Sequence, residues 1–539
     1  MSKNALLIGG AGTGKTTRLL ESVAKMLARG QDPYSIGFIS FTNAATDNAL
    51  RRAACQFGFD EKAIRRDGWF RTLHSFCYRL LNIKAGQILA EDSAAGRKWF
   101  SEKMGYTPGE SKGPFDKSSE EIILAFWDVC RQRLEPWPVT WARCGRLIPI
   151  PALDRASDII ERYEQAKRLD NLSDFTDLLG RFSGVRFDTG EAGHLDTCPE
   201  GWLPSLDSII IDEAQDNSPL MDRCLRRLAD DSRFAILAGD PFQSIFQFSG
   251  SDASLFQAWP REKYEVMPQS HRCPARILEL GERCLTHTRG YWDRKIAPRQ
   301  EPGRIDSEYH PLPLVSKIDV RESWLLLART NYGLSKFTSQ LRREGIPYIM
   351  RDGGSSWAAP TRNGEIYSLL MLEQRKPITE PEWGDILKLK DLPVKFGDET
   401  FLTHGTKAAW KKRELTDELA NLDCLEKWGA TEALRNRIGN GTWRQFIPFA
   451  DEYCRAVLKY GHKAVSEPRI LVSTIHSAKG LEADNVALLT TTSRIVEMGR
   501  DDPDQRDEEH RLAYVGVTRA KKSLTVIDEP SEQFRLEVG

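Results

Sequence analysis

The stretch that decides the fold is residues 5–16, ALLIGGAGTGKT. Its first four residues are apolar and predict a short parallel strand that is buried on both faces. Behind the glycines, Leu19, Val23 and Leu27 recur every four residues, which predicts an amphipathic helix that Gly30 can end. The segment between strand and helix matches GxxxxGK[ST], in which glycines let backbone N–H groups turn inward around phosphate oxygens. We therefore predict a phosphate-binding loop at the start of a helix.

The residue types in this loop point to ATP with Mg²⁺. Lys15 supplies a cation for the β- and γ-phosphates, and the hydroxyl of Thr16 is a ligand for Mg²⁺. The alternative is a structural glycine loop. The motif alone does not distinguish among kinases, GTPases and other P-loop ATPases. The predicted nucleotide contacts of the loop are Gly9, Gly10, Ala11, Gly12, Thr13, Gly14, Lys15, Thr16 and Thr17.

Acidic residues follow a second apolar run, residues 208–211. Ligands bind at the carboxyl ends of strands in open α/β sheets, so Asp212 is expected to hold Mg²⁺ and Glu213 to act as general base on the attacking water. A third apolar run, residues 234–238, leads to Gln243, which is placed to sense the γ-phosphate. The alternatives are a solvated acidic turn at Asp212 and an ordinary turn at Gln243.

Composition excludes several classes of protein. The 539 residues suggest three or four units of about 150 residues each. The net charge is −1, from 76 basic and 77 acidic residues, which argues against a bulk basic coat but not against a local basic track. None of the ten cysteines forms a CxxC pair, so neither a zinc ribbon nor a redox motif is expected. With no signal peptide and no membrane-spanning run, we expect a cytoplasmic protein.

A series of motifs then resembles one family. DEAQD at 212–216, followed by GDPFQSIFQFSG at 239–250, resembles motifs II and III of the UvrD/Rep-type helicases of superfamily 1. The other resemblances are FTNAA at 41–45 to motif Ia, TLHSF at 72–76 to motif Ib, DFTDLL at 174–179 to a block before motif II, SHR at 270–272 to motif IV, TIHSAKGLE at 474–482 to motif V and LAYVGVTRA at 512–520 to motif VI.

The resemblance implies an α/β fold with two RecA-like P-loop cores, each with a parallel sheet and each interrupted by a mainly helical insertion. We expect the first core at 1–85 and 201–260, its insertion at 86–200, the second core at 261–375 and 465–539, and its insertion at 376–464. Four tryptophans in the second insertion, Trp383, Trp410, Trp428 and Trp443, are expected to form its own small core.

The resemblance also assigns nucleotide contacts outside the loop. Arg272 and Arg519 stand where the family places arginines that neutralise transition-state charge. Glu482 matches the residue that bonds the ribose. His271 stands where a tyrosine often stacks on the base, and an imidazole stacks more weakly. Relatives carry a segment with an adenine-reading glutamine before the P-loop, and we do not expect it here because the P-loop strand begins at residue 5. The resemblance therefore does not imply a strict preference for ATP over GTP.

DNA contacts are likewise implied by the resemblance. Phe41, Phe246 and Phe248 match positions where relatives place rings against bases. The alternative for Phe41 is core packing, because it ends an apolar run. The polar positions matched to DNA contacts are Thr42, Asn43, His74 and Ser477. Where motif III often has Trp-Arg, this chain has Phe248 and Ser249, which removes one cation.

The implied function is an ATP-dependent helicase that translocates 3′ to 5′ on single-stranded DNA or a tailed duplex. A second hypothesis is a nucleotide-gated DNA sensor or regulatory subunit that acts with a partner nuclease in defence or recombination. Partners in replication or repair are compatible with either, and no membrane partner is expected. A P-loop kinase or GTPase does not explain Gln243, Arg272, Glu482 and Arg519 together.

Overall fold

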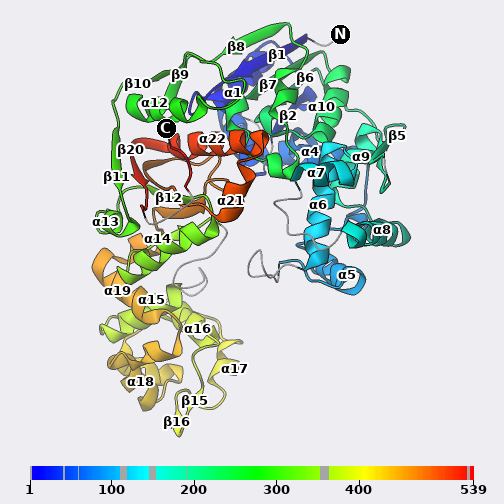
Figure 1. The fold of residues 1–539 in the computed structure, drawn as a ribbon. Helices are drawn as coiled ribbons and strands as arrows, with labels where there is room; N and C mark the ends of the chain where they lie inside the picture. The colour runs from blue at the N-terminus through cyan, green and yellow to red at the C-terminus, as the bar shows by residue number, and fades with distance from the viewer. Residues whose placement is uncertain are drawn as a thin grey trace. The chain divides into compact units, whose positions relative to one another are not determined.

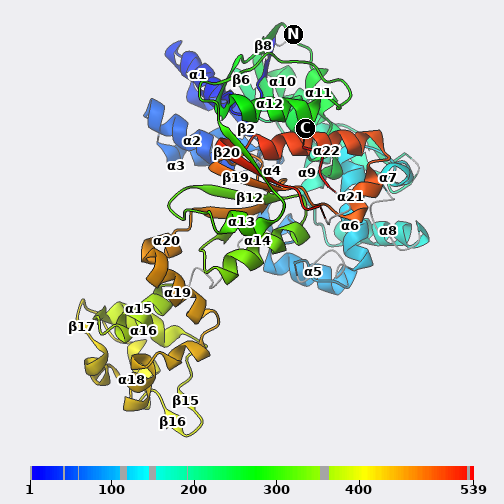
Figure 2. The same cartoon turned by 60° about the vertical axis from the view of Figure 1, so that its left-hand side comes forward.

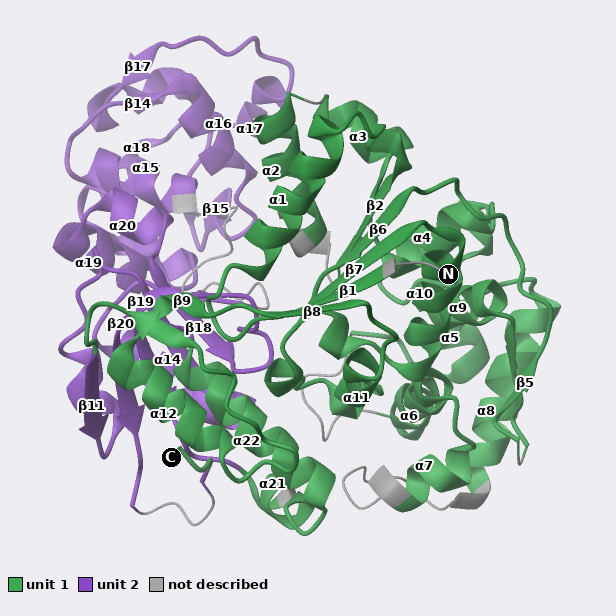
Figure 3. Ribbon diagram, turned by 90° about the horizontal axis from the view of Figure 1, so that it is seen from above, with its two compact units in different colours: residues 1–303, 493–518, 536–539 green, residues 304–492, 519–535 purple. Residues whose placement is uncertain are grey.

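The computed structural model describes residues 3–40, 43–58, 60–109, 118–144, 153–190, 192–351, 363–530 and 535–538. The chain divides into two compact units, coloured separately in Figure 3. Unit 1 comprises residues 1–303, 493–518 and 536–539, and unit 2 comprises residues 304–492 and 519–535. The boundary at residue 303 falls inside the segment that the resemblance assigns to the second core, and the four-part division stays a prediction.

Unit 1 is built on a six-stranded sheet in which all paired strands run parallel, in the order β3-β2-β6-β7-β1-β8. Alternate residues of each strand face opposite sides, so Leu6 and Ile209 pack into one apolar cluster and Leu7 and Ile210 into another. Both faces of β1, β6 and β7 are therefore buried, as their uninterrupted apolar runs predict. The strands are β1 (Lys3–Ile8), β2 (Ile36–Ser40), β3 (Trp69–Thr72), β6 (Ser208–Ile211), β7 (Phe234–Gly239) and β8 (Lys263–Val266).

Helices and short turns of unit 1 follow these strands (Figure 1). Outside the predicted first insertion, the helices that follow these strands are α1 (Lys15–Ala28), α2 (Asn43–Phe57), α3 (Glu61–Asp67), α4 (Leu73–Leu80), α10 (Pro219–Asp231) and α11 (Ala253–Gln257). Three 3₁₀ turns are η3 (Ala214–Asp216), η4 (Pro241–Gln243) and η5 (Gln247–Ser249). Unit 1 also includes β9 (Gln269–Pro274), α12 (Ala275–Leu285), β10 (Ala297–Arg299), α21 (Arg494–Gly499) and α22 (Pro503–Val517).

The segment predicted as the first insertion is mainly helical, and part of it packs around an aromatic-rich core that includes Trp99, Phe126 and Trp127. Beside this core, a buried cluster of charges surrounds Asp174, which pairs with Arg131 and with Lys167, each at 2.7 Å. Its elements are α5 (Ala94–Met104), α6 (Ser119–Arg133), α7 (Trp137–Cys144), α8 (Leu153–Leu169), α9 (Phe175–Ser183), β4 (Val185–Phe187) and β5 (His194–Asp196).

Unit 2 contains a second six-stranded sheet, also with parallel pairing throughout, in the order β11-β20-β19-β12-β18-β13. The fold class with two parallel sheets is thus confirmed. The strands are β11 (Arg304–Glu308), β12 (Trp324–Ala328), β13 (Ile349–Met350), β18 (Ile470–Thr474), β19 (Ala483–Leu489) and β20 (Ala520–Ile527). Two helices beside them are α13 (Pro311–Val315) and α14 (Asn331–Arg343).

The segment 363–466 of unit 2, which includes the predicted second insertion, packs around its own apolar cluster, and Figures 1 and 2 both show α16 and α18 away from the sheet. Trp383, Trp428 and Trp443 are fully buried in its apolar cluster, and Trp410 packs against that cluster, as expected for a small independent core. Its helices are α15 (Asn363–Glu373), α16 (Glu380–Lys388), α17 (Thr406–Trp410), α18 (Glu432–Gly439), α19 (Ala450–Tyr460) and α20 (His462–Ser466). Its short hairpins pair β14 (Ile378–Thr379) with β17 (Leu419–Ala420) and β15 (Lys395–Phe396) with β16 (Glu399–Thr400).

Candidate functional site

The glycine loop of residues 9–16 connects β1 to α1 at the carboxyl edge of the first sheet. Gly12 (φ 69°) and Gly14 (φ 83°) have left-handed backbones, which other residues rarely adopt. The loop continues the sheet at its start, where the Gly9 N–H donates to the Gly239 carbonyl at 3.0 Å. Lys15 folds back over the loop, and its Nζ donates to the Gly9 carbonyl at 3.0 Å. The loop is therefore ordered around its own lysine.

The two predicted metal ligands lie together. The Thr16 hydroxyl donates to Oδ2 of Asp212 at 2.6 Å. Burial and the neighbouring charge of Glu213 raise the pKa of Asp212 to about 6, although Thr16 and Lys15 act against the shift. A hydroxyl and a carboxylate are hard oxygen ligands that suit Mg²⁺, which completes its shell with water and phosphate oxygens. Among the described residues, no group of three or more His, Cys, Asp or Glu side chains is placed to hold a metal, and Mg²⁺ with a nucleotide does not need one.

Glu213 has a left-handed backbone (φ 56°), a conformation that costs energy for a residue with a Cβ. Its carboxylate accepts a hydrogen bond from Nε2 of Gln215 at 2.6 Å. Oε1 of the same glutamine accepts from the Asp240 N–H at 2.9 Å, so Gln215 connects the ends of β6 and β7. Gln215 is a site residue that no motif assignment predicted. Its place between two acids in DEAQD was the available signal.

Gln243 lies in η4, just beyond β7, and is buried. Its Nε2 donates to Oδ2 of Asp240 at 2.7 Å. Asp240 also pairs with Arg294, through Nη1 at 2.5 Å. The predicted γ-phosphate sensor is thus held by a buried ion pair that the sequence analysis did not foresee.

The segment 270–272 lies against the glycine loop within unit 1. The Ser270 hydroxyl donates to the Ala11 carbonyl at 2.7 Å, and the His271 N–H donates to the Gly12 carbonyl at 2.9 Å. A Cβ placed on Gly12 would collide with the Cβ of Arg272. Nη1 of Arg272 donates to the Thr518 carbonyl at 3.5 Å. The structure therefore brings His271 and Arg272 beside the loop, with the arginine head directed to α22.

Three predicted site residues, Arg519, Glu482 and Ser477, belong to unit 2. Arg519 is buried, and its Nη1 donates to the Leu481 carbonyl at 3.3 Å. Glu482 forms an ion pair with Lys521 at 2.5 Å. The hydroxyl of Ser477 accepts from the hydroxyl of Thr474 at 3.1 Å in the turn after β18.

The predicted DNA contacts differ in exposure. Phe248 is 61% exposed and packs edge-on against Phe246, with ring centroids 6.0 Å apart. His74 on α4 packs edge-on against Phe175 at 6.1 Å, and burial lowers its pKa, opposed by Asp128 and Asp174. Phe41 and Thr42 lie outside the described residues, and Asn43 is described only as the first residue of α2. Arg52 of α2 donates to the hydroxyl of Thr17 at 3.0 Å.

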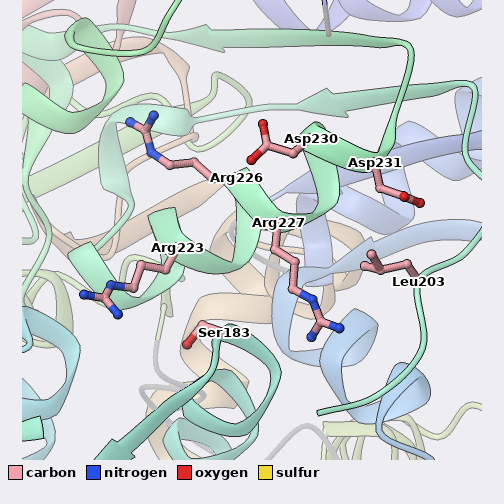
Figure 4. Close-up of a pocket in the computed structure, with 7 residues that line it drawn as sticks. All are labelled: Ser183, Leu203, Arg223, Arg226, Arg227, Asp230 and Asp231. Carbon is pink, nitrogen blue, oxygen red and sulfur yellow. The ribbon is translucent and has the colours of Figure 1, made fainter. Parts of the chain in front are cut away.

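A surface hollow lies elsewhere in unit 1, along α10 (Figure 4). Its volume is about 520 Å³, and it is lined by Ser183, Leu203, Arg223, Arg226, Arg227, Asp230 and Asp231. None of the predicted site residues lines it. Arg227 donates to the Phe182, Glu200 and Gly201 carbonyls, and Arg226 pairs with Asp222 at 2.6 Å. We interpret these arginines as structural.

Comparison with known proteins identifies related sequences along the chain. The model of the UvrD/REP helicase N-terminal domain matches residues 1–123 and 146–263, and that of the UvrD-like helicase C-terminal domain matches residues 414–529. YjcD of Bacillus subtilis is 24% identical over 604 residues, which cover 96% of this chain and 76% of that protein. DNA helicase II of Escherichia coli is 22% identical over 615 residues, which cover 97% of this chain and 82% of that protein.

ATP-dependent DNA helicase UvrD2 of Mycobacterium tuberculosis is 22% identical over 573 residues, which cover 96% of this chain and 76% of that protein. The solved structure of the PRRSV helicase covers 99% of this chain and 55% of its own, with a TM-score of 0.33 and 12% identity, a likeness too weak to add to these matches. Within the described residues, no helix is both long and apolar enough to cross a membrane.

Proposed function

Because the chain belongs to the UvrD/REP helicase family and is an ATP-dependent DNA helicase, we propose that it translocates 3′ to 5′ along single-stranded DNA and separates duplex ahead of it. The direction follows from the family resemblance. The substrate that fits this activity is a duplex with a single-stranded 3′ tail.

The observation that carries the ATPase proposal is the 2.6 Å hydrogen bond between Thr16 and Asp212 beside the glycine loop. We assign this pair to Mg²⁺, which when bound would screen the phosphate charges of ATP. Lys15 binds the β- and γ-phosphates once its bond to the Gly9 carbonyl is exchanged for phosphate oxygens. Glu213 orients and deprotonates the attacking water, and Gln243 contacts the γ-phosphate.

We assign the stabilisation of transition-state charge to Arg272 and Arg519. An arginine supplies a delocalised cation and several N–H donors, which match the oxygens of a phosphoryl group in transfer. Glu482 is assigned to the ribose hydroxyls and His271 to stacking on the base, and both assignments rest on the resemblance.

We assign base stacking to Phe248 and Phe246. The exposed fraction of Phe248, 61%, is high for a large apolar ring, and a stacked base would cover it. Phe41 of motif Ia is also proposed to stack on a base, and we propose DNA contacts for the polar residues Thr42, Asn43, His74 and Ser477.

Two assays test this function. Steady-state ATP hydrolysis is measured with and without single-stranded DNA, and we expect stimulation of at least about tenfold that weakens as salt increases. Strand displacement is then measured on duplexes with a 3′ tail, a 5′ tail or blunt ends, and we expect unwinding of the 3′-tailed duplex.

Two other outcomes would change the proposal. ATP hydrolysis without unwinding, together with a nuclease that co-purifies with the chain, would favour the sensor hypothesis. Absence of stimulation by any nucleic acid would exclude translocation.

A further inference from the structure

A buried carboxylate, Asp240, connects several parts of the nucleotide site of unit 1. Its side chain is fully buried and pairs with the fully buried guanidinium of Arg294 at 2.5 Å. It also accepts hydrogen bonds from Nε2 of Gln243 at 2.7 Å and from the Phe242 N–H at 3.1 Å. Arg294 is held in turn by Glu282 at 2.5 Å. The orientation of Gln243 is thus set by a carboxylate that is itself fixed.

The hydroxyl of Tyr514 joins this carboxylate to the glycine loop. It accepts a hydrogen bond from the Ala11 N–H at 3.0 Å and donates one to Oδ2 of Asp240 at 3.3 Å. Burial raises the pKa of Tyr514 well above its usual value, so the hydroxyl keeps the proton that it donates. The ring is fixed independently, because it lies 5.2 Å from the Arg294 guanidinium and beside Gly281.

We propose that Tyr514 is a positioning residue for ATP hydrolysis, through which the glycine loop and Gln243 are held in register. This proposal deepens the ATPase function proposed above and rests on it. A loop with left-handed glycines has many accessible conformations, and Tyr514 and Ser270 restrain it from both polar atoms of the Ala11 backbone. The Tyr514 oxygen accordingly contacts both the loop, at Ala11, and Asp240, the carboxylate that anchors Gln243.

The first test is Tyr514→Phe, which removes this oxygen and keeps the ring. ATP hydrolysis is measured with saturating single-stranded DNA. We expect kcat to fall about fivefold to tenfold, the value of one well-placed hydrogen bond, with KM for ATP changed by less than about twofold. The matched control is Tyr453→Phe, which alters another buried tyrosine whose hydroxyl has no hydrogen-bond partner among the described residues. We expect kcat of this control to equal that of the wild type.

A double-mutant cycle separates positioning from general packing. The variants are Tyr514→Phe, Gln243→Ala and their combination. If Tyr514 acts through the anchor of Gln243, adding Tyr514→Phe to Gln243→Ala lowers kcat by less than about twofold further. The proposal would be overturned if the kcat loss of the double variant equalled the product of the two single losses. It would also be overturned if Tyr514→Phe alone left kcat unchanged. An equal loss in Tyr453→Phe, or a kcat loss explained by a lower melting temperature, would overturn it as well.

Failure of this proposal is distinguishable from failure of the proposed function. A wild-type chain that hydrolyses no ATP would refute the function itself. A wild-type chain with DNA-stimulated hydrolysis and a fully active Tyr514→Phe variant would refute only the role of Tyr514.

Discussion

The Thr16 hydroxyl donates a hydrogen bond to Oδ2 of Asp212 at 2.6 Å across a separation of 196 residues. The strands that precede them, β1 and β6, are not neighbours, because β7 lies between them. The contact therefore depends on both side chains leaving the same edge of a parallel sheet, where the carboxyl ends of strands collect polar groups.

Replacing Lys15 with alanine should lower kcat for ATP hydrolysis by about a hundredfold to a thousandfold, because one preorganised cation on the phosphates is lost. The fold should persist, since among the described residues Nζ makes one hydrogen bond, to the Gly9 carbonyl. Lys25→Ala is the matched control, because Lys25 is an exposed lysine of the same helix. Turnover near the wild-type rate in Lys15→Ala would contradict a role for this lysine.

Replacing Arg272 with alanine should lower kcat by about a thousandfold or more while ATP binding changes little, as expected for a group that acts on transition-state charge. Equilibrium binding of a fluorescent ATP analogue and single-turnover hydrolysis measure the two effects separately. Arg276→Ala, at an exposed position of α12, provides the control. A loss of binding as large as the loss of rate would assign Arg272 to ground-state binding.

The pKa of Asp212 makes the stability of the metal-free protein depend on pH. Burial is the largest cause and the charge of Glu213 the next, and together they raise this pKa from 3.8 to about 6. The folded protein therefore binds the proton more tightly than the unfolded chain does. The carboxyl group therefore lowers stability progressively between pH 4 and pH 6, and the loss is complete above about pH 6. In EDTA, Asp212→Asn should have a higher free energy of unfolding than the wild type. This gain should be larger at pH 7.5 than at pH 5, by on the order of 1 kcal/mol.

Chemical denaturation of both proteins at the two pH values measures this difference. Added Mg²⁺ should then raise the melting temperature of the wild type more than that of Asp212→Asn. Parallel responses of the two proteins to pH and to Mg²⁺ would show that Asp212 does not govern the metal site.

Replacing Phe248 with alanine should weaken binding of single-stranded DNA about tenfold, the value of one stacked base. Hydrolysis of ATP without DNA should stay unchanged, because we assign this exposed ring to DNA and not to the nucleotide. Fluorescence anisotropy with labelled oligonucleotides measures the affinity. Tyr264→Ala removes another exposed ring of unit 1 and is expected to bind DNA like the wild type. Equal losses in both variants would argue against a stacking site at Phe248.

Replacing Asp174 with asparagine should destabilise the fold by about 3 kcal/mol at neutral pH, because Arg131 and Lys167 would lose a buried partner. Burial opposes the charge of Asp174, but the two cations overcome it and hold its pKa well below the usual range. This stabilisation is present above the pKa of the unfolded chain and is lost as the pH falls. Urea denaturation measures it, with Asp158→Asn, an exposed position on α8, as control. An equally small effect of both substitutions would contradict the role of this cluster.

Local patterns in the sequence predicted much of this structure. The apolar runs at 5–8, 208–211 and 234–238 lie within β1, β6 and β7, because a strand buried on both faces has an uninterrupted apolar sequence. The residues directly after these strands could be assigned from the chemistry of phosphate and metal. Thr16 and Asp212 were each predicted as Mg²⁺ ligands for that reason.

The residues that hold those groups could not be predicted in the same way. Tyr514 and Ala11 are 503 positions apart, and no spacing rule relates them. Arg294 lies in no motif, and a single arginine in a sequence is more often a solvated surface group than a buried anchor. Gln215 was missed for another reason, because Asp212 and Glu213 already explained the chemistry of the motif. Contacts of this kind depend on tertiary packing, which periodicity does not encode.

The close approach of Gly12 to Arg272 limits how this loop can be changed. Gly12 has a left-handed backbone, and it also lies directly against the backbone of Arg272. The Cβ of an alanine at this position would therefore displace β9. A phosphate-binding loop transplanted from an unrelated NTPase would therefore have to match the contour of residues 270–272 before it met any nucleotide. Engineering of this enzyme's nucleotide preference has more freedom at His271, which lies at the surface, than inside the loop itself.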